Sequence, residues 1–240
     1  MRRSYIVMFC IMLAAPASAS EKNPVAAVHK PFGTVDCNAD GIWKKAAPAM
    51  PLFSGNVIRT HERSFAIIKF LESSILRVQE RSEVEIRGTK SSGKEFSKNV
   101  HMRSGGLGFN VKKRPNEKFE FTTPTSVASI RGTEGALFSD PDSSDLLVLE
   151  TGSVLFTNTV SHRSVDVLGG QTGQSFANGE IRVRPSLPGD IDRMHHLRDL
   201  GSMSDTTGTL RGDAGQQRDE LRIRMKDQNG NPKTLILKFE

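Results

Sequence analysis

Short runs of branched and aromatic residues, separated by Gly, Ser, Pro and Asn, occupy most of the chain between residues 57 and 184. Within these runs apolar and polar residues alternate, which places successive side chains on opposite faces of a strand. No stretch before Pro188 shows the helical periodicity of about 3.6 residues. Many short strands at close, even spacing predict an all-β fold, either a sandwich, a barrel or a solenoid.

Eleven runs carry this strand pattern. They are Val57–Thr60, Phe65–Leu71, Ile75–Val78, Val84–Arg87, Val100–Arg103, Gly105–Val111, Lys118–Phe121, Val127–Arg131, Leu146–Glu150, Ser153–Asn158 and Ser164–Leu168, and Ile181–Arg184 follows them with the same character. A short first strand is expected at Phe32–Val35. The glycine and prolines of residues 36–51 predict a loop, and a polar loop is expected at residues 90–98.

The first nineteen residues are typical of a secretory signal peptide. Arg2 and Arg3 form a basic start, Tyr5–Ala15 is an apolar run, and Ala17–Ala19 is a small-residue cleavage site. The apolar run is too short to span a bilayer as a stable helix, and no second such run follows it. We therefore expect an exported chain that is cleaved near Ala19, spans no membrane and continues as a polar tether at residues 20–30.

The character of the chain changes after Pro188. Residues 188–201 have apolar side chains three apart and a glycine at Gly201, which predicts a short helix that stops there. Residues 202–218 are almost free of apolar side chains and are typical of a flexible linker. Residues 219–240 contain two alternating runs around Asn229-Gly230, the strongest short-range signal for a β-hairpin. An isolated hairpin is marginal in water, so its apolar face should dock on this chain or on a second copy.

Charge and cysteine content restrict the possible partners. The formal charge of +6 falls to 31 − 27 = +4 once the two arginines of the signal peptide are removed, and the remaining charges are interspersed. This pattern is typical of a solvated surface, and an exported protein is not expected to bind nucleic acid. After cleavage one cysteine remains, Cys37, which is either a buried small residue or an exposed thiol that could join two chains. Self-association is thus possible through Cys37 or the terminal hairpin.

The residue types that carry catalysis or bind metals show no suitable arrangement. The histidines are scattered, and no serine or cysteine lies in a nucleophile motif. Asp140, Asp142 and Asp145 lack the glycine and the final glutamate of a calcium loop, so they predict an acidic hairpin tip. We expect no catalytic residue, no cofactor and no metal.

Residues 118–137 concentrate proline, glycine and charge. Pro124 removes one backbone donor and holds Thr123 extended, so the chain should turn there. Arg131 stands between a strand and the glycines that follow, three residues before Glu134. In the favoured interpretation the guanidinium bonds to Glu134 and to turn carbonyls and holds a corner closed. In the other, Arg131 contacts a partner or an anionic ligand. The candidate residues for such a corner or contact are Thr123, Pro124, Arg131, Gly132, Thr133 and Glu134.

The segment Thr123–Glu134, with the sequence TPTSVASIRGTE, resembles the most diagnostic strand and corner of the FecR domain family. Further similar segments occur in the family's order: Gly33–Val35, Gly55–Thr60, Ser64–Phe70, Ser82–Ile86, Val148–Val154 and Gly169–Gln171. The resemblance covers residues 31–184, and we take residues 31–187 as a FecR-like β domain. One departure is Glu72-Ser73-Ser74, which stands where the family usually has an Asp-Gly turn.

The resemblance implies a periplasmic all-β domain, solenoid-like or a flattened two-sheet wrap of short strands, here followed by a short helix and a C-terminal β-hairpin. In the regulators that name the family, this domain receives a signal from an outer-membrane receptor. It then controls a cytoplasmic anti-sigma region through a membrane helix. We expect neither that region nor that helix here, and therefore a free-standing exported member. The resemblance implies no catalytic residues.

Two functions follow as hypotheses. The leading one is a non-enzymatic interaction or signalling-type module that binds a protein partner in the cell envelope through strand edges or the exposed corner. The alternative is a module that binds an envelope ligand, either cell-wall glycan or an anionic component. Glycan sites favour Trp and Tyr platforms, and the cleaved chain would keep only Trp43 and no Tyr, which counts against a glycan.

Overall fold

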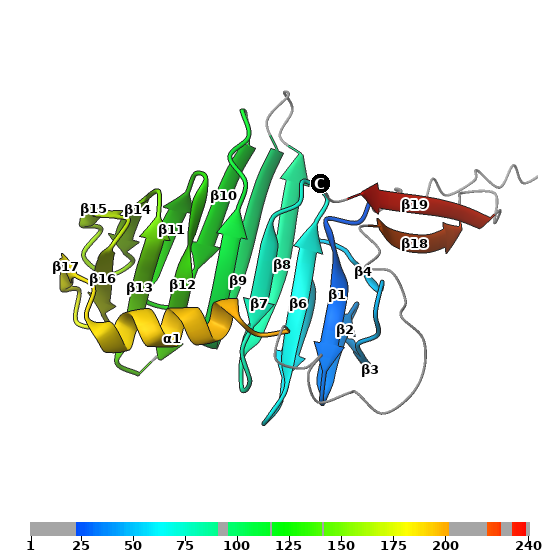
Figure 1. Ribbon diagram of the computed structural model, residues 1–240, viewed down its shortest axis with the longest axis horizontal. Helices are drawn as coiled ribbons and strands as arrows, with labels where there is room; N and C mark the ends of the chain where they lie inside the picture. The colour runs from blue at the N-terminus through cyan, green and yellow to red at the C-terminus, as the bar shows by residue number, and fades with distance from the viewer. Residues whose placement is uncertain are drawn as a thin grey trace, which may run out of the picture.

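A computed structural model describes residues 23–90, 96–115, 117–140, 142–201, 220–226 and 232–238 of the chain. In this part of the chain seventeen strands form one continuous hydrogen-bonded network, and two further strands pair with each other. One helix is present among the described residues. The network is folded into two layers that share a single long strand, β9 (Figure 1).

The front layer of Figure 1 follows the order β4-β1-β6-β7-β9-β12-β13-β16-β17. Its strands are β1 (Ala26–Phe32), β4 (Pro51–Leu52), β6 (Phe65–Phe70), β7 (Ile75–Val78), β9 (Phe96–Val111), β12 (Thr133–Asp140), β13 (Ser144–Thr151), β16 (Gln171–Phe176) and β17 (Ile181–Pro185). All neighbouring strands of this layer are antiparallel.

The back layer follows the order β3-β2-β5-β8-β9-β10-β11-β14-β15. Its further strands are β2 (Val35–Ala39), β3 (Ile42–Lys45), β5 (Asn56–Thr60), β8 (Glu83–Lys90), β10 (Glu117–Thr122), β11 (Ser126–Ile130), β14 (Ser153–Asn158) and β15 (Ser164–Leu168). The pairing is antiparallel except between β9 and β10, which run parallel. Neither layer closes on itself, so the expected all-β fold is confirmed as an open, flattened two-sheet wrap with one short helix.

Strand β9 passes from one layer to the other at Gly105. Its first part pairs with β8 in the back layer, and its last part pairs with β7 and β12 in the front layer. Gly105 has a φ of 106°, a conformation that L side chains rarely adopt, and a Cβ there would lie 2.1 Å from Ser82 Oγ. The same hydroxyl accepts a hydrogen bond from the Gly106 N–H at 3.0 Å. The expected bend at these glycines therefore joins the two layers.

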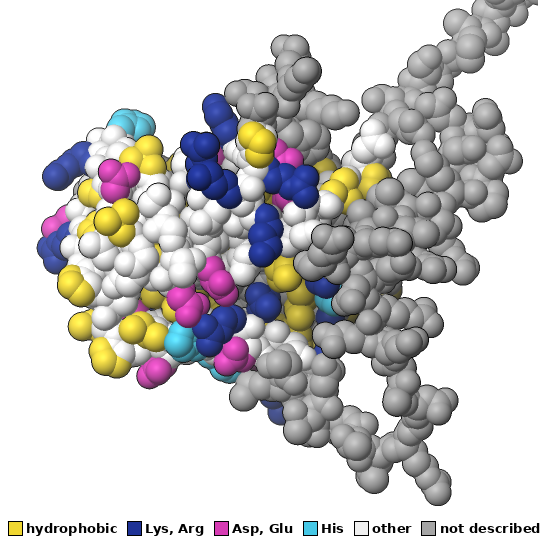
Figure 2. Space-filling model, turned by 45° about the horizontal axis from the view of Figure 1, so that its top comes forward, with side chains coloured by type: hydrophobic (Ala, Val, Ile, Leu, Met, Phe, Trp, Pro, Cys, Tyr) yellow, Lys and Arg dark blue, Asp and Glu magenta, His cyan; other side chains and the backbone are white. Residues whose placement is uncertain are grey.

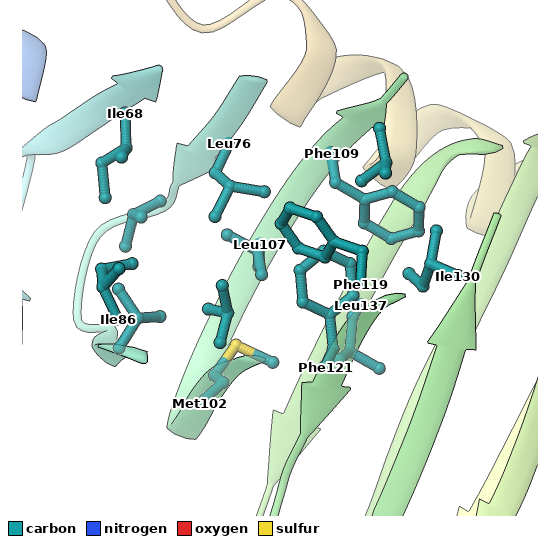
Figure 3. Packing of buried hydrophobic residues seen from close by; sticks show 14 of the residues in the cluster. Ile68, Leu76, Ile86, Met102, Leu107, Phe109, Phe119, Phe121, Ile130 and Leu137 are labelled. Atoms are coloured by element: carbon teal, nitrogen blue, oxygen red, sulfur yellow. The ribbon is translucent and has the colours of Figure 1, made fainter. Parts of the chain in front are cut away.

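The main core lies between the layers (Figure 3). Phe119 and Phe121, predicted to share a face, are both buried there with their ring centroids 5.4 Å apart. Phe109 from β9 lies 4.8 Å from Phe121, measured between ring centroids. Full burial of one such side chain stabilises a fold by about 1.5–3 kcal/mol. The core therefore holds β9, β10 and β11 firmly at the centre of the wrap.

Helix α1 (Pro188–Arg198) lies across the outer face of the front layer (Figure 1). It buries Met194 and Leu197 in a second apolar cluster with side chains of β12 and β13. A Cβ on Gly108 would lie 3.0 Å from Leu197 Cβ, so the glycine lets the helix approach the sheet closely. Gly201, with a φ of 99°, follows the helix. The predicted helix and its stop are confirmed.

The N-terminal part of the chain differs from its prediction. Part of the expected tether and first strand forms β1, and Gly33 is a turn with a φ of 70° between β1 and β2. Strand β1 was missed because Ala26, Ala27 and Val28 are all buried, and a strand buried on both faces shows no alternation. The predicted loop at residues 36–51 likewise contains most of β2, all of β3 and the first residue of β4.

Cys37 on β2 is buried, with 3% of its surface exposed. Burial raises the pKa of its thiol, which keeps it protonated and unreactive. Of the two alternatives for Cys37, the buried small residue is confirmed, because the sulfur packs in the core between the layers, and nothing supports self-association through this thiol.

Two further strands, β12 and β16, were not predicted from the sequence. Both contain glycines and polar residues that weaken the strand pattern. Gly135 in β12 is required by close approach, because a Cβ there would lie 2.3 Å from the Val148 carbonyl oxygen. Phe96–Lys98, which were predicted as part of the polar loop at residues 90–98, belong to β9. Residues 91–95 of that loop lie outside the described residues.

The C-terminal strands β18 (Glu220–Lys226) and β19 (Pro232–Lys238) pair antiparallel, as the hairpin prediction requires. The turn at Asn229-Gly230, the linker, the signal peptide and the start of the tether lie outside the described residues. Self-association through this hairpin stays a prediction.

Candidate functional site

Strand β11 connects two corners that together contain the predicted site residues. The lower corner, residues 123–126, leads into β11 from β10, and the upper corner, residues 130–134, leads from β11 into β12. The two corners therefore lie at opposite edges of the wrap.

The lower corner encloses a buried carboxylate. Asp145, on β13, has no exposed surface, and its Oδ2 accepts hydrogen bonds from the hydroxyls of Thr123, Thr125 and Ser126, the last at 2.6 Å. Hydroxyl donors compensate a carboxylate for the loss of water. Asp145 was predicted to be part of an acidic, solvated hairpin tip. That prediction is wrong, because the side chain points between the layers.

Hydrogen bonds between hydroxyls and the backbone also hold the lower corner. Thr123 Oγ1 accepts the N–H of Thr125 at 3.2 Å and that of Ser126 at 2.9 Å. Pro124 is exposed, and its carbonyl accepts a hydrogen bond from Thr159 Oγ1 at 2.9 Å. These contacts give Thr123 and Pro124 a structural role, because the buried polar groups of the turn have partners within the chain.

The upper corner turns at Gly132, whose φ is 66°. A Cβ on Gly132 would lie 2.7 Å from Lys113 Cβ, so the residue is required both by its conformation and by the close approach of a neighbouring loop. Thr133 is buried, and its hydroxyl donates to the Ser153 carbonyl at 3.3 Å. Gly132 and Thr133 therefore hold the corner itself.

Arg131 and Glu134 do not pair, so the favoured interpretation of this corner is wrong. The chain crosses from the back layer to the front layer between them, which places the two side chains apart. Glu134 accepts a hydrogen bond from Asn110 Nδ2 at 3.0 Å, and its charge also acts on the half-buried Arg77. Burial lowers the pKa of Arg77, and the Glu134 carboxylate raises it. Arg131 is exposed and contacts no acidic partner among the residues that the structure describes.

Arg131 lies at a hollow of about 430 Å³ on the upper edge of the wrap. The hollow is lined by Arg114, Glu117, Lys118, Phe119, Glu120, Ser129, Ile130 and Arg131. Figure 2, which tilts the upper edge of Figure 1 toward the reader, shows Lys and Arg side chains gathered on this edge. We call Arg114, Lys118 and Arg131 the basic rim.

The strand register builds this hollow. Strands β10 and β11 pair with Phe119 opposite Ile130 and Glu120 opposite Ser129, so the ends of the two strands meet at the upper edge. The hollow has two acids: Glu117 accepts from Lys98 Nζ at 3.1 Å, whereas Glu120 accepts only from the neutral Ser129 hydroxyl at 3.4 Å and keeps its charge. The three cations of the basic rim form no ion pair in the described part of the chain, and three cations against two carboxylates, 3 − 2 = +1, give the lining a net positive charge.

A buried ion pair lies beside the hollow. Lys98 Nζ is 2.5 Å from Glu72 Oε2, and both side chains are 4% exposed. Glu72, Lys98, Arg114 and Glu117 also line a second hollow of about 200 Å³, together with Val25 and Leu71. Arg114 and Glu117 are therefore shared by the two hollows. The pair anchors the strand ends beneath the basic rim.

Glu72 of this pair belongs to the turn Glu72-Ser73-Ser74, which departs from the resemblance. Ser73 has a φ of 75°, the left-handed conformation that glycine adopts most easily in an Asp-Gly turn. Ser74 Oγ accepts a hydrogen bond from the Lys112 N–H at 3.1 Å, which ties the turn to the loop that carries Arg114. The substituted turn thus supports the basic rim.

Sequence reasoning found Arg131 but missed Arg114, Lys118 and the pair between Glu72 and Lys98. Three consecutive basic residues at 112–114, next to a predicted strand, were a signal that could have been used. The buried pair had no local signal, because its members are 26 residues apart in sequence. Among the described residues, no three His, Cys, Asp or Glu side chains are close enough to hold a metal ion. The described residues contain no helix long and apolar enough to cross a membrane.

Comparisons with known proteins place this region in a family. A family model described as FecR protein matches residues 56–155, which include both corners and the basic rim. No curated protein matches the chain.

Two crystal structures of a candidate anti-sigma factor from Parabacteroides distasonis have a similar arrangement of strands. The first is 14% identical, with 57% of this chain and 62% of that chain covered and a TM-score of 0.48. The second is 12% identical, with 75% of this chain and 98% of that chain covered and a TM-score of 0.47. Residues 56–155 of this chain therefore match the FecR protein family, as the resemblance of Thr123–Glu134 and its flanking segments predicted.

Proposed function

We propose that this chain is an exported, non-enzymatic FecR-type module that binds a protein partner in the cell envelope. The observation that carries the proposal is the basic rim, in which three cations that form no ion pair among the described residues surround a hollow with two acids, one of them bonded to Lys98. The rim lies within the residues that match the family, at the end of its most diagnostic segment.

The chemistry of the rim favours carboxylates on the partner. A guanidinium can bond a carboxylate through two parallel N–H groups, whereas a lysine ammonium acts as a point charge. A single exposed ion pair contributes only about 0–1 kcal/mol. Several cations around one hollow add up and also speed the encounter with an acidic surface. We therefore expect the partner to present a cluster of Asp and Glu side chains.

Other features support the remaining parts of the proposal. The match of residues 56–155 to the FecR family supports a signalling or regulatory role. Export to the periplasm, or secretion, rests on the pattern of residues 1–19.

Charge reversal at the rim tests the proposal. Arg131→Glu combined with Lys118→Glu reverses two rim charges, and Arg163→Glu on an exposed loop between β14 and β15 is the matched control. A photo-crosslinking residue at Ser129 should capture an envelope protein in intact cells, and the purified pair should then bind in solution. The double variant should lose this binding while the control keeps it. Equal binding by both variants, with wild-type unfolding curves, would rule out the rim as the contact.

A second candidate is a module for an anionic envelope ligand. The hollow of about 430 Å³ falls within the range of about 300–1,000 Å³ that is typical of ligand pockets. Sedimentation with purified peptidoglycan decides between the two, because a ligand module should co-sediment in a rim-dependent manner and a protein-binding module should stay in solution.

A further inference from the structure

Strand β3 forms the outer edge of the back layer. It pairs only with β2 among the described residues, and all four of its residues are exposed. An edge strand of this kind presents a row of backbone N–H and C=O groups to solvent.

The register shows which backbone groups are available. Strands β2 and β3 are joined by the two-residue turn Asp40-Gly41, with φ values of 51° and 84°, so the flanking residues Ala39 and Ile42 form a hydrogen-bonded pair. Hydrogen-bonded and non-hydrogen-bonded pairs alternate along an antiparallel ladder. The Ala46 N–H donates to the Val35 carbonyl at 2.8 Å, which agrees with this alternation. The backbone groups of Trp43 and Lys45 therefore point away from β2.

The edge of the front layer at the opposite end of the wrap is built differently. The edge strand β17 contains Pro185, and its Arg184 bonds to Asp190 at 2.5 Å, features that discourage another strand from pairing there. On β3, by contrast, Ile42 and Trp43 are 59% and 41% exposed. The Trp43 ring lies against the Arg59 guanidinium at 4.0 Å, which holds it on the outer face of the layer. Edge β3 thus offers both free hydrogen bonds and apolar contact area.

The charge of β3 determines which kind of strand can pair with it. Lys44 and Lys45 are adjacent on β3. Pairing with β3 of a second copy would bring like charges together across the new ladder, which is destabilising. Acidic side chains opposite the two lysines would be stabilising. We propose that β3 accepts an extended acidic segment of a partner protein as an added strand, hydrogen-bonded to Trp43 and Lys45. The inference goes beyond the rim contact and depends on β3 alone.

Peptide selection on the folded, full-length chain tests the inference. A library of random eight-residue peptides is selected on the wild-type protein and counter-selected on Lys45→Pro. Proline removes the outward N–H of residue 45 but leaves the inward bonds to β2, so the variant should fold. Lys45→Ala is the matched control that removes the charge and keeps the N–H.

The expected peptides alternate Asp or Glu with branched residues. Lys45→Pro should weaken their binding about tenfold or more, as expected for a lost ladder bond at a buried interface, and Lys45→Ala about two- to fivefold. Trp43 is the single tryptophan of the chain, so its fluorescence should shift to the blue when a peptide binds. Slowed amide exchange at residues 43 and 45 would identify the edge directly.

Other outcomes overturn the inference. Peptides without acidic residues, or peptides that bind Lys45→Pro as tightly as the wild type, would exclude an acidic added strand. A blue shift with vesicles containing anionic lipid and none with peptides would identify β3 as a membrane contact instead. A dimer whose formation depends on Trp43 would identify a second copy as the occupant.

Discussion

The two corners at the ends of β11 belong to one segment of twelve residues, yet they are built in opposite ways. In the lower corner Thr123, Thr125 and Ser126 all turn their hydroxyls inward to Asp145. In the upper corner Gly132 and Thr133 make the turn, and Arg131 points into an open hollow. The difference shows that the segment most diagnostic of the family combines a structural half with a half that is available for contacts.

Removal of Asp145 should have the largest effect, because it leaves three buried hydroxyls without their acceptor. Asp145→Ala should lower the free energy of unfolding by about 3 kcal/mol or more. Urea unfolding followed by far-UV circular dichroism measures the change. Asp142→Ala, at an exposed position in the same hairpin, is the control and should change little. A loss below about 1 kcal/mol for Asp145→Ala would contradict a structural lower corner.

The turn of the upper corner should also be structural, although less so. Gly132→Ala places a Cβ at a φ of 66° and 2.7 Å from Lys113 Cβ. We expect a loss of about 1–2 kcal/mol from the left-handed conformation. Gly170→Ala is a matched control, since its φ is 79° but no atom lies within 4 Å of the added Cβ. Equal losses in the two variants would show that conformation alone, and not the neighbouring loop, requires the glycine.

A second buried carboxylate, Asp190, can be compared with Asp145. Asp190 contacts a cation, whereas Asp145 accepts hydrogen bonds from hydroxyls. Asp190 Oδ2 lies 2.5 Å from Arg184 Nη1 and accepts the Leu187 N–H at 2.9 Å. The hydrogen bond from Arg184 is the largest cause that lowers the pKa of Asp190 below its ordinary value. The stability from this contact is therefore present above the ordinary pKa of aspartate and lost as the pH falls through the lowered value.

Asp190→Asn should remove this acid dependence and cost about 1 kcal/mol at neutral pH. Unfolding curves of the wild type and the variant between neutral and acidic pH measure it, and they should converge at the acidic end. Curves that stay parallel over the whole range would exclude Asp190 as the source.

Arg131→Ala should have the smallest effect on stability, below about 0.5 kcal/mol, because an exposed side chain without an acidic partner holds nothing in place. The same substitution should weaken binding of the envelope partner. Thermal unfolding and a binding titration are measured on one preparation. A large loss of stability in Arg131→Ala would show that Arg131 has a structural role, and the two corners would then not differ in the way described.

The sequence by itself determined most of the strands and the helix, because both follow from local patterns. The alternation at Phe119 and Phe121 and the stop at Gly201 were read correctly from neighbours along the chain. The family was also recognisable, since its diagnostic segment is contiguous. Strand β1 was not predicted, because a strand that is buried on both faces shows no alternation of apolar and polar residues.

Only the tertiary structure decided which charged groups meet. Arg131 and Glu134 are three residues apart but are separated by the crossing between layers, whereas Glu72 and Lys98 are distant in sequence and 2.5 Å apart in the fold. Likewise, Asp145 lies in a polar turn sequence, and strand pairing carries it into the cage of hydroxyls. Strand periodicity is set by the nearest neighbours of a residue. The pairing of strands, and with it the environment of each charge, is set by contacts far along the chain.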